Sequence, residues 1–171
     1  MKSSPLKGLR ILALENYIAG PYGSMILGDL GAEVIKIEPP IGDLARSFAG
    51  PNHKGEGFYY LAFNRNKRSV VLNLAMPSNK RAFYDLVKVS DVVWDNFRPG
   101  VTKRLKVNYN TLKKLNPRII CCSITGYGQT GPRKNQLSYD LIGQAISGIM
   151  SITGEPGRPP ARCGPPVGDL V

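Results

Sequence analysis

The chain has 171 residues, of which 42% are hydrophobic and 20% are charged, and its formal net charge is +11. This length favours a single domain, and the composition excludes a disordered or collagen-like chain. No apolar run reaches the roughly 18–20 residues of a membrane span, and the N-terminus lacks a signal-peptide pattern, so we expect a cytoplasmic protein.

The predicted elements alternate between strands and helices. Apolar runs predict strands at residues 9–14, 33–37, 69–74, 91–94 and 118–124. Helices are expected at residues 22–30, 79–89, 109–115 and 139–150, and Pro21 suits the first position of the first helix. Residues 41–59 and 154–168 are rich in glycine and proline and are expected to be irregular. This order predicts an α/β fold with a Rossmann-like parallel sheet and flanking helices.

The chain has three cysteines and one histidine, and their spacing points to no special chemistry. Cys121, Cys122 and Cys163 are odd in number and lack the spacing of zinc ligands. We therefore expect buried thiols in a reducing compartment, with no disulfide framework and no metal. His53 has no evident partner for a catalytic triad.

Basic residues are concentrated in one stretch. No Asp or Glu occurs from Asn96 to Tyr139. That stretch contains Arg98, Lys103, Arg104, Lys106, Lys113, Lys114, Arg118, Arg133 and Lys134. The pattern indicates a polyanionic partner, either a nucleic acid or a phosphate-bearing cofactor. A dinucleotide is disfavoured because the loop after the first predicted strand lacks the G-x-G-x-x-G spacing.

Two aspartates stand where a helix or a turn begins. Asp140 opens the last predicted helix, and Asp169 follows Gly168 in a proline-rich context. An aspartate at such a position usually caps backbone N–H groups, so spacing alone favours structural roles for both over catalytic ones.

A series of segments nevertheless resembles, in order, the N-terminal part of the class III CoA-transferases, the family of formyl-CoA transferase and carnitine CoA-transferase. The matching segments are residues 5–12, 19–21, 27–38 with 42–43, 64–69, 95–100, 123–132, 138–140 and 168–169. The resemblance runs from Leu6 to Val171. It implies that residues 1–171 are an incomplete N-terminal part of the family's large domain, that the small domain and the C-terminal segment are absent, and that full-length chains interlock as homodimers. The apolar onset just before Val171 also suggests a truncated chain.

The resemblance implies transfer of CoA from an acyl-CoA thioester to a free carboxylic acid, with coenzyme A as the co-substrate and no metal. The matching nucleophile is Asp169, which forms a mixed anhydride and then an aspartyl-CoA thioester. A carboxylate nucleophile divides one difficult exchange into easier steps. Gly168 leaves room for backbone N–H groups to approach a developing oxyanion.

The positions that contact CoA in the family carry over to residues spread along this chain. They are Ile18, Ala19, Leu72, Asn73, Leu74, Ala75, Asn96, Phe97, Arg98, Arg104, Leu137, Ser138, Tyr139 and Asp140. The arginines among them would face the phosphates of CoA. The chain departs from the family where some members have Gln in place of Ile18, an Arg in place of Pro39 and a Lys near Leu137.

Other functions remain as alternatives. The family includes α-methylacyl-CoA racemases, which carry a His-Asp pair where this chain has Tyr139-Asp140. A racemase needs an acid/base group on each side of the α-carbon, so this substitution argues against racemization. An inactive truncated remnant is a second alternative. The third is a basic nucleic-acid-binding domain, which only the charge supports.

Overall fold

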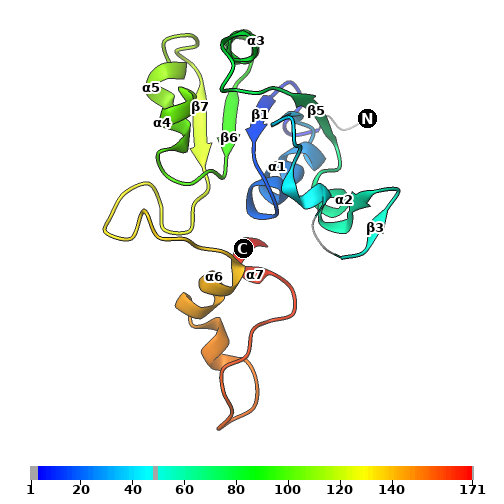
Figure 1. The fold of residues 1–171 in the computed structure, drawn as a ribbon, viewed down its shortest axis with the longest axis vertical. Coiled ribbons are helices and arrows are strands. Elements are labelled where there is room, and N and C mark those ends of the chain that lie inside the picture. Colours follow the sequence, from blue (N-terminus) through cyan, green and yellow to red (C-terminus); the bar gives the residue numbers. More distant parts are fainter. Residues whose placement is uncertain (1–3, 48–49, 171) are drawn as a thin grey trace. The chain divides into compact units, whose positions relative to one another are not determined.

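Strand β1 (Arg10–Leu14) is central because both of its edges pair with parallel strands. The computed structural model describes residues 4–47 and 50–170. Strand β2 (Glu33–Glu38) lies on one side of β1 and β6 (Val92–Asp95) on the other. Strands β5 (Lys67–Val71) and β7 (Ile120–Ser123) complete the parallel order β5-β2-β1-β6-β7 (Figure 1), which confirms the predicted α/β fold.

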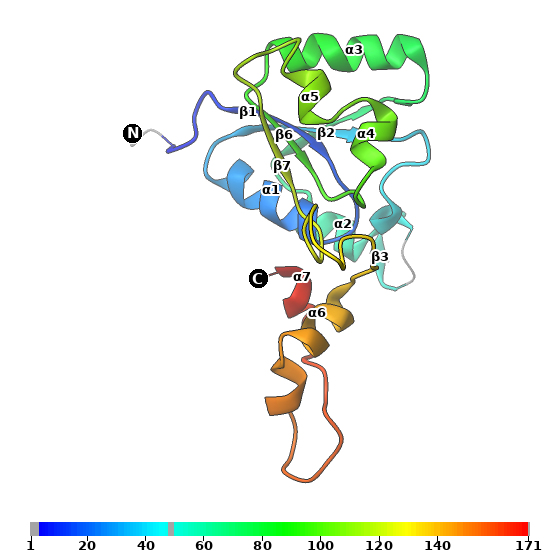
Figure 2. The same cartoon turned by 90° about the vertical axis from the view of Figure 1, so that its left-hand side faces the viewer.

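Helices cover both faces of this sheet (Figure 2). Helix α1 (Ala19–Asp29) lies on one face. Helices α3 (Pro77–Lys88), α4 (Val101–Leu105) and α5 (Tyr109–Leu112) lie on the other. Side chains alternate along a strand, so β1 sends Leu12 and Leu14 towards α3 and Ile11 and Ala13 towards α1. Both faces of β1 are therefore buried, which explains its uninterrupted apolar sequence.

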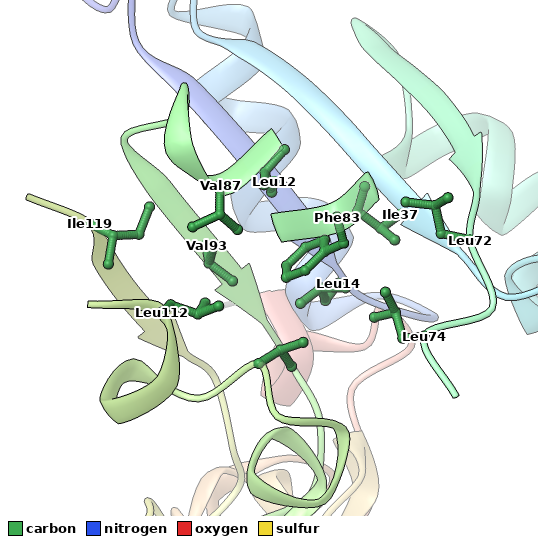
Figure 3. Close-up of a cluster of buried hydrophobic side chains, with 11 residues drawn as sticks. Leu12, Leu14, Ile37, Leu72, Leu74, Phe83, Val87, Val93, Leu112 and Ile119 are labelled. Atoms are coloured by element: carbon green, nitrogen blue, oxygen red, sulfur yellow. The ribbon is translucent and has the colours of Figure 1, made fainter. Parts of the chain in front are cut away.

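The larger core cluster lies between the sheet and α3. Figure 3 shows Phe83 and Val87 of α3 among the side chains of β1, β2 and β6. Leu72 and Leu74, which follow β5, belong to the same cluster. Phe83 has no exposed surface, so this one ring joins the helix to several strands.

The chain forms two compact units, Met1–Ile124 and Thr125–Val171. The first unit holds the sheet together with the short helix η1 (Leu44–Arg46), the hairpin β3 (Asn52–His53) and β4 (Glu56–Gly57), and helix α2 (Phe58–Phe63). The second unit contains α6 (Asp140–Ile146), η2 (Ile149–Ile152) and α7 (Val167–Leu170). No helix in the described part of the chain is both long and apolar enough to cross a membrane.

Three predicted boundaries are wrong for identifiable reasons. Helix α1 begins at Ala19, and Pro21 stands at its third position, where its missing N–H is not needed. Strand β5 ends at Val71 because Asn73 turns the chain: its Oδ1 accepts a hydrogen bond from the Ala75 N–H at 3.1 Å. Helix α6 ends at Ile146 because Gly148 adopts a left-handed φ of 82°.

Other expectations fail on burial or on local order. Cys121, Cys122 and Cys163 are free thiols but only half-buried, and the first two lie on the edge strand β7. Residues 41–59 contain η1 and the β3–β4 hairpin instead of irregular chain alone. Helices α2 and α4 are too short to show a clear 3.6-residue period, so the sequence pattern did not reveal them.

Replacing Phe83 with Ala should lower the free energy of unfolding by about 3–5 kcal/mol, because the cavity left by the ring lies inside the main core. The matched control is Val89→Ala, since Val89 is 60% exposed just after the same helix. Urea unfolding of both variants measures the difference, and equal losses of stability would contradict this description of the core.

Candidate active site

The strand order points to one place beyond the carboxyl ends of the strands as a candidate ligand site. From β1 the chain adds β2 and β5 on one side, and then β6 and β7 on the other. The direction of winding thus reverses between β1 and β6. In open parallel sheets, ligands bind beyond the carboxyl ends of the strands at this kind of reversal. The loops that leave β1 and β6 are therefore the first candidates for a ligand site in the first unit.

Side chains lock these two loops together. The Asn96 side chain accepts a hydrogen bond from the Asn16 N–H at 2.9 Å and donates one to the Asn16 carbonyl at 2.8 Å. The Trp94 indole N–H donates to the Gly20 carbonyl at 3.0 Å. A Cβ at Gly20 would stand 2.7 Å from Asn96 Cγ, so the loops approach too closely for a side chain there.

Four predicted CoA contacts lie on these loops. Ile18 is the N-cap of α1 and Ala19 is its first residue, so both stand where helix N–H groups can receive an anion. Asn96 and Phe97 follow β6 directly. The side chain of Asn96 bonds the β1–α1 loop, and Phe97 packs against the main core, so both side chains have structural roles beside this site.

In the predicted segment Leu72–Ala75, some side chains belong to the core or to a turn, and others are exposed and could contact a ligand. Leu72 and Leu74 are 9% and 7% exposed and belong to the main core. Asn73 is half-buried and its side chain holds the turn, while Ala75 is exposed. We therefore expect any ligand contact from the two leucines to be made by their backbone.

The two predicted arginines present their side chains to solvent. Arg98 follows Phe97, and Arg104 lies in the last turn of α4. Both are exposed, and within residues 4–47 and 50–170 neither guanidinium forms an ion pair with a carboxylate. Guanidinium groups in this state are suited to bind phosphate.

In the second unit, Asp140 connects the start of α6 to α7. Its carboxylate accepts one hydrogen bond from the Gly168 N–H and one from the Gln144 side chain, both at 2.8 Å. A Cβ at Gly168 would stand 2.6 Å from the Asp140 carbonyl oxygen. Gly168 therefore permits close contact between the two helices. Its own N–H donates to the Asp140 carboxylate, and the expected room for N–H groups near an oxyanion stays a prediction.

Gln144 is a residue of this site that the sequence analysis missed. It is fully buried, and its Oε1 accepts a hydrogen bond from the Cys163 N–H at 2.8 Å. It thereby joins the proline-rich segment before α7 to Asp140. The only signal in the sequence was the spacing of four residues from Asp140, which places both side chains on one face of α6.

The remaining predicted residues of the second unit lie just before α6. Leu137 and Tyr139 are 53% and 60% exposed, and Tyr139 is the N-cap. Ser138 is half-buried against Gly126, where a Cβ would stand 2.0 Å from the Ser138 Cβ. In residues 4–47 and 50–170, no three His, Cys, Asp or Glu side chains group to hold a metal ion.

Asp169 lies within α7 and is half-buried. Burial raises the pKa of its carboxyl group above the usual 3.8, and the nearby negative charge of Asp140 raises it further. A carboxylate of raised pKa is more basic and a better nucleophile while it is ionised. Asp169 therefore combines partial exposure with a carboxyl group of raised pKa.

Replacing Asp140 with Asn should lower the pKa of Asp169, because the like charge is removed while the effect of burial remains. Carbon-13 NMR titration of aspartate carboxyl groups measures this directly. The exposed Glu155 of the same unit provides the control, since Glu155→Gln should leave the pKa of Asp169 unchanged. A pKa of Asp169 that stays the same or rises in Asp140→Asn contradicts the assigned cause.

Comparison with known proteins places the chain in a family. Residues 6–171 match the family model described as CoA-transferase family III. The succinyl-CoA:glutarate CoA-transferase of Mus musculus is 46% identical over 168 residues, covering 98% of this chain and 38% of the relative. The acetyl-CoA:oxalate CoA-transferase of Acetobacter aceti is 47% identical over 161 residues, covering 94% of this chain and 41% of the relative.

A solved structure agrees with these sequence matches. The crystal structure of a CAIB/BAIF family protein from Brucella suis is 39% identical with a TM-score of 0.93, covering 99% of this chain and 46% of that one. The chain thus spans less than half the length of these relatives. The match of family model, sequence and fold shows that this chain belongs to CoA-transferase family III.

Proposed function

We propose that the protein transfers CoA from an acyl-CoA thioester to a free carboxylic acid, with Asp169 as the nucleophile. The observation that carries the proposal is the state of Asp169, a half-buried carboxylate of raised pKa on a backbone that Asp140 and Gln144 hold in place. Membership of the family and the names of the relatives supply the reaction class.

The proposed cycle has four balanced steps at Asp169. Its carboxylate attacks the acyl-CoA thioester, forms a mixed anhydride and releases CoA thiolate. The thiolate attacks the aspartyl carbonyl, forms an aspartyl-CoA thioester and releases the donor acid. The acceptor carboxylate then displaces CoA to form a second anhydride. The thiolate finally attacks the acceptor's acyl carbon, which gives the new acyl-CoA and restores Asp169.

Residues of this chain hold the CoA portion in the proposal. The N-terminus of α1 at Ile18 and Ala19, together with the exposed Arg98 and Arg104, offers N–H groups and positive charges suited to phosphates. Leu72–Ala75 and Leu137–Asp140 complete the proposed contacts. Ile18 has no amide side chain, so we propose that backbone N–H groups are the oxyanion donors near it.

The relatives suggest which acids to test. Their names specify succinyl-CoA with glutarate in one case and acetyl-CoA with oxalate in another, and both of these acceptors are dicarboxylic acids. We therefore propose a dicarboxylic acid as the acceptor and succinyl-CoA as a suitable donor. No ATP is required, because thioester and anhydride are both activated acyl groups.

The remaining expectations concern assembly and location. We propose that residues 1–171 form the N-terminal part of a larger domain, that full-length chains interlock as a homodimer, and that the protein acts in the cytoplasm. The three thiols, which the structure leaves free, fit a reducing compartment. Sedimentation of the protein expressed from its complete reading frame measures the oligomeric state.

The Asp169→Ala and Asp169→Asn variants of the protein from its complete reading frame should lose at least about a thousandfold in transfer rate, because neither can form the anhydride. Transfer from succinyl-CoA to glutarate or oxalate is the assay, and Glu155→Gln is the control expected to remain active. In the wild type, the rate should fall as the pH drops through the raised pKa of Asp169. Undiminished transfer by both Asp169 variants would contradict the proposal.

A further inference from the structure

We propose that Glu15, Lys36, Asp43 and Lys67 are positioning residues for acyl-CoA binding, because together they hold the loop between β1 and α1 at the carboxyl end of β1. We call these four residues the charge quartet. The inference rests on the proposed function in one respect, since that function identifies acyl-CoA as the ligand of the loop.

The charge quartet is buried and electrically balanced. The side chains of Glu15, Lys36 and Asp43 have no exposed surface, and that of Lys67 is 2% exposed. Lys67 Nζ lies 2.7 Å from Glu15 Oε1, and Lys36 Nζ lies 2.7 Å from Asp43 Oδ2 and 3.6 Å from Glu15 Oε1. Burial lowers the pKa of Lys67 to about 8, while the negative charge of Glu15 opposes that shift.

Stability alone does not account for four charges in this position. Burying an ion pair costs desolvation energy, which the attraction between the charges repays only where the geometry is excellent and further hydrogen bonds are made. Apolar side chains of similar volume are often at least as stable in such a place. The charge quartet therefore has to be explained by what its polar atoms hold.

Its polar atoms hold the backbone of the loop and of the first turn of α1. Lys36 Nζ donates to the Glu15 carbonyl at 3.4 Å, and Lys67 Nζ donates to the Pro21 carbonyl at 2.8 Å. Asp43 Oδ1 accepts a hydrogen bond from the Tyr17 N–H at 3.1 Å. Tyr17 has a left-handed φ of 64°, which a non-glycine residue keeps only when its surroundings enforce it.

The opposite side of the loop is held from β6. Asn96 bonds both backbone groups of Asn16, and Trp94 bonds the Gly20 carbonyl. The charge quartet and these two residues thus clamp the loop from two directions. Between the clamped points lie Ile18 and Ala19, which open helix α1. Loss of one side should displace the N–H groups that are proposed to meet the ligand.

Two substitutions at Asp43 separate positioning from stability. Asp43→Ala removes both the charge and the oxygen that accepts from the N–H groups of Tyr17 and Ala45, whereas Asp43→Asn removes the charge but keeps an oxygen acceptor. Both variants leave Lys36 with a surplus buried charge, so both should lower the melting temperature. Asp85→Ala is the matched control, because Asp85 forms an exposed ion pair with Lys88 on α3.

Two properties are measured. The first is the fluorescence emission of Trp94 in the absence of ligand, and the second is the pair of kinetic constants KM and kcat for succinyl-CoA. Trp94 is the only tryptophan of these 171 residues, and its indole N–H bonds the Gly20 carbonyl in the first turn of α1, next to the loop. In the protein from its complete reading frame, comparison with Trp94→Phe isolates its emission. Asp43→Ala should shift this fluorescence emission. It should also raise the KM for succinyl-CoA about tenfold, which corresponds to the free energy of one lost hydrogen bond. Its kcat should stay within about twofold of the wild-type value. Asp43→Asn and Asp85→Ala should keep a KM close to that of the wild type.

Two results would overturn the inference. One is an Asp43→Ala protein with the wild-type KM, whatever its melting temperature. The other is an Asp43→Asn protein whose KM rises as much as that of Asp43→Ala, because the effect then follows lost stability. Failure of the proposed function is recognised separately, by transfer that survives in Asp169→Ala. In that case the unliganded emission of Trp94 still decides whether Asp43 holds the loop.

Discussion

The exit of the chain from β1 is the constraint on which the first unit depends. Strand β1 is buried on both faces and paired on both edges. The backbone groups of the loop that leaves it therefore need hydrogen-bond partners outside the sheet. Side chains from other segments supply these partners: Asn96 and Trp94 from one side, Lys36 and Asp43 from the other. The start of α1 is therefore placed by residues distant in sequence, which fixes one wall of the candidate site.

In the second unit, too, side-chain hydrogen bonds hold segments that lie apart in the sequence. The carboxylate of Asp140 bonds Gly168 and Gln144, and Gln144 in turn bonds Cys163. One buried amide and one carboxylate thus organise a segment rich in proline and glycine. The same carboxylate raises the pKa of Asp169 through its charge. Asp140 thus has two effects in this unit: it bonds neighbouring segments, and it adds to the effect of burial on the pKa of Asp169.

The sequence predicted those parts of the fold that depend on a pattern of neighbouring residues. The apolar runs at β1, β2, β6 and β7 identified the parallel sheet, and the ordered family segments identified the family. Long-range contacts were not visible in this way. Nothing near Lys36 in the sequence signals that it meets Asp43 and Glu15 in the interior. Leu72 and Leu74 matched a ligand-binding segment, but only the fold reveals that their side chains are core.

The central claim is that CoA passes through a covalent bond to Asp169, and mass spectrometry tests it most directly. The protein from its complete reading frame is mixed with succinyl-CoA, quenched in acid and digested. The peptide containing Asp169 should gain the mass of one CoA less one water, and hydroxylamine should remove the adduct. An unmodified peptide in an enzyme that still transfers CoA would contradict the account.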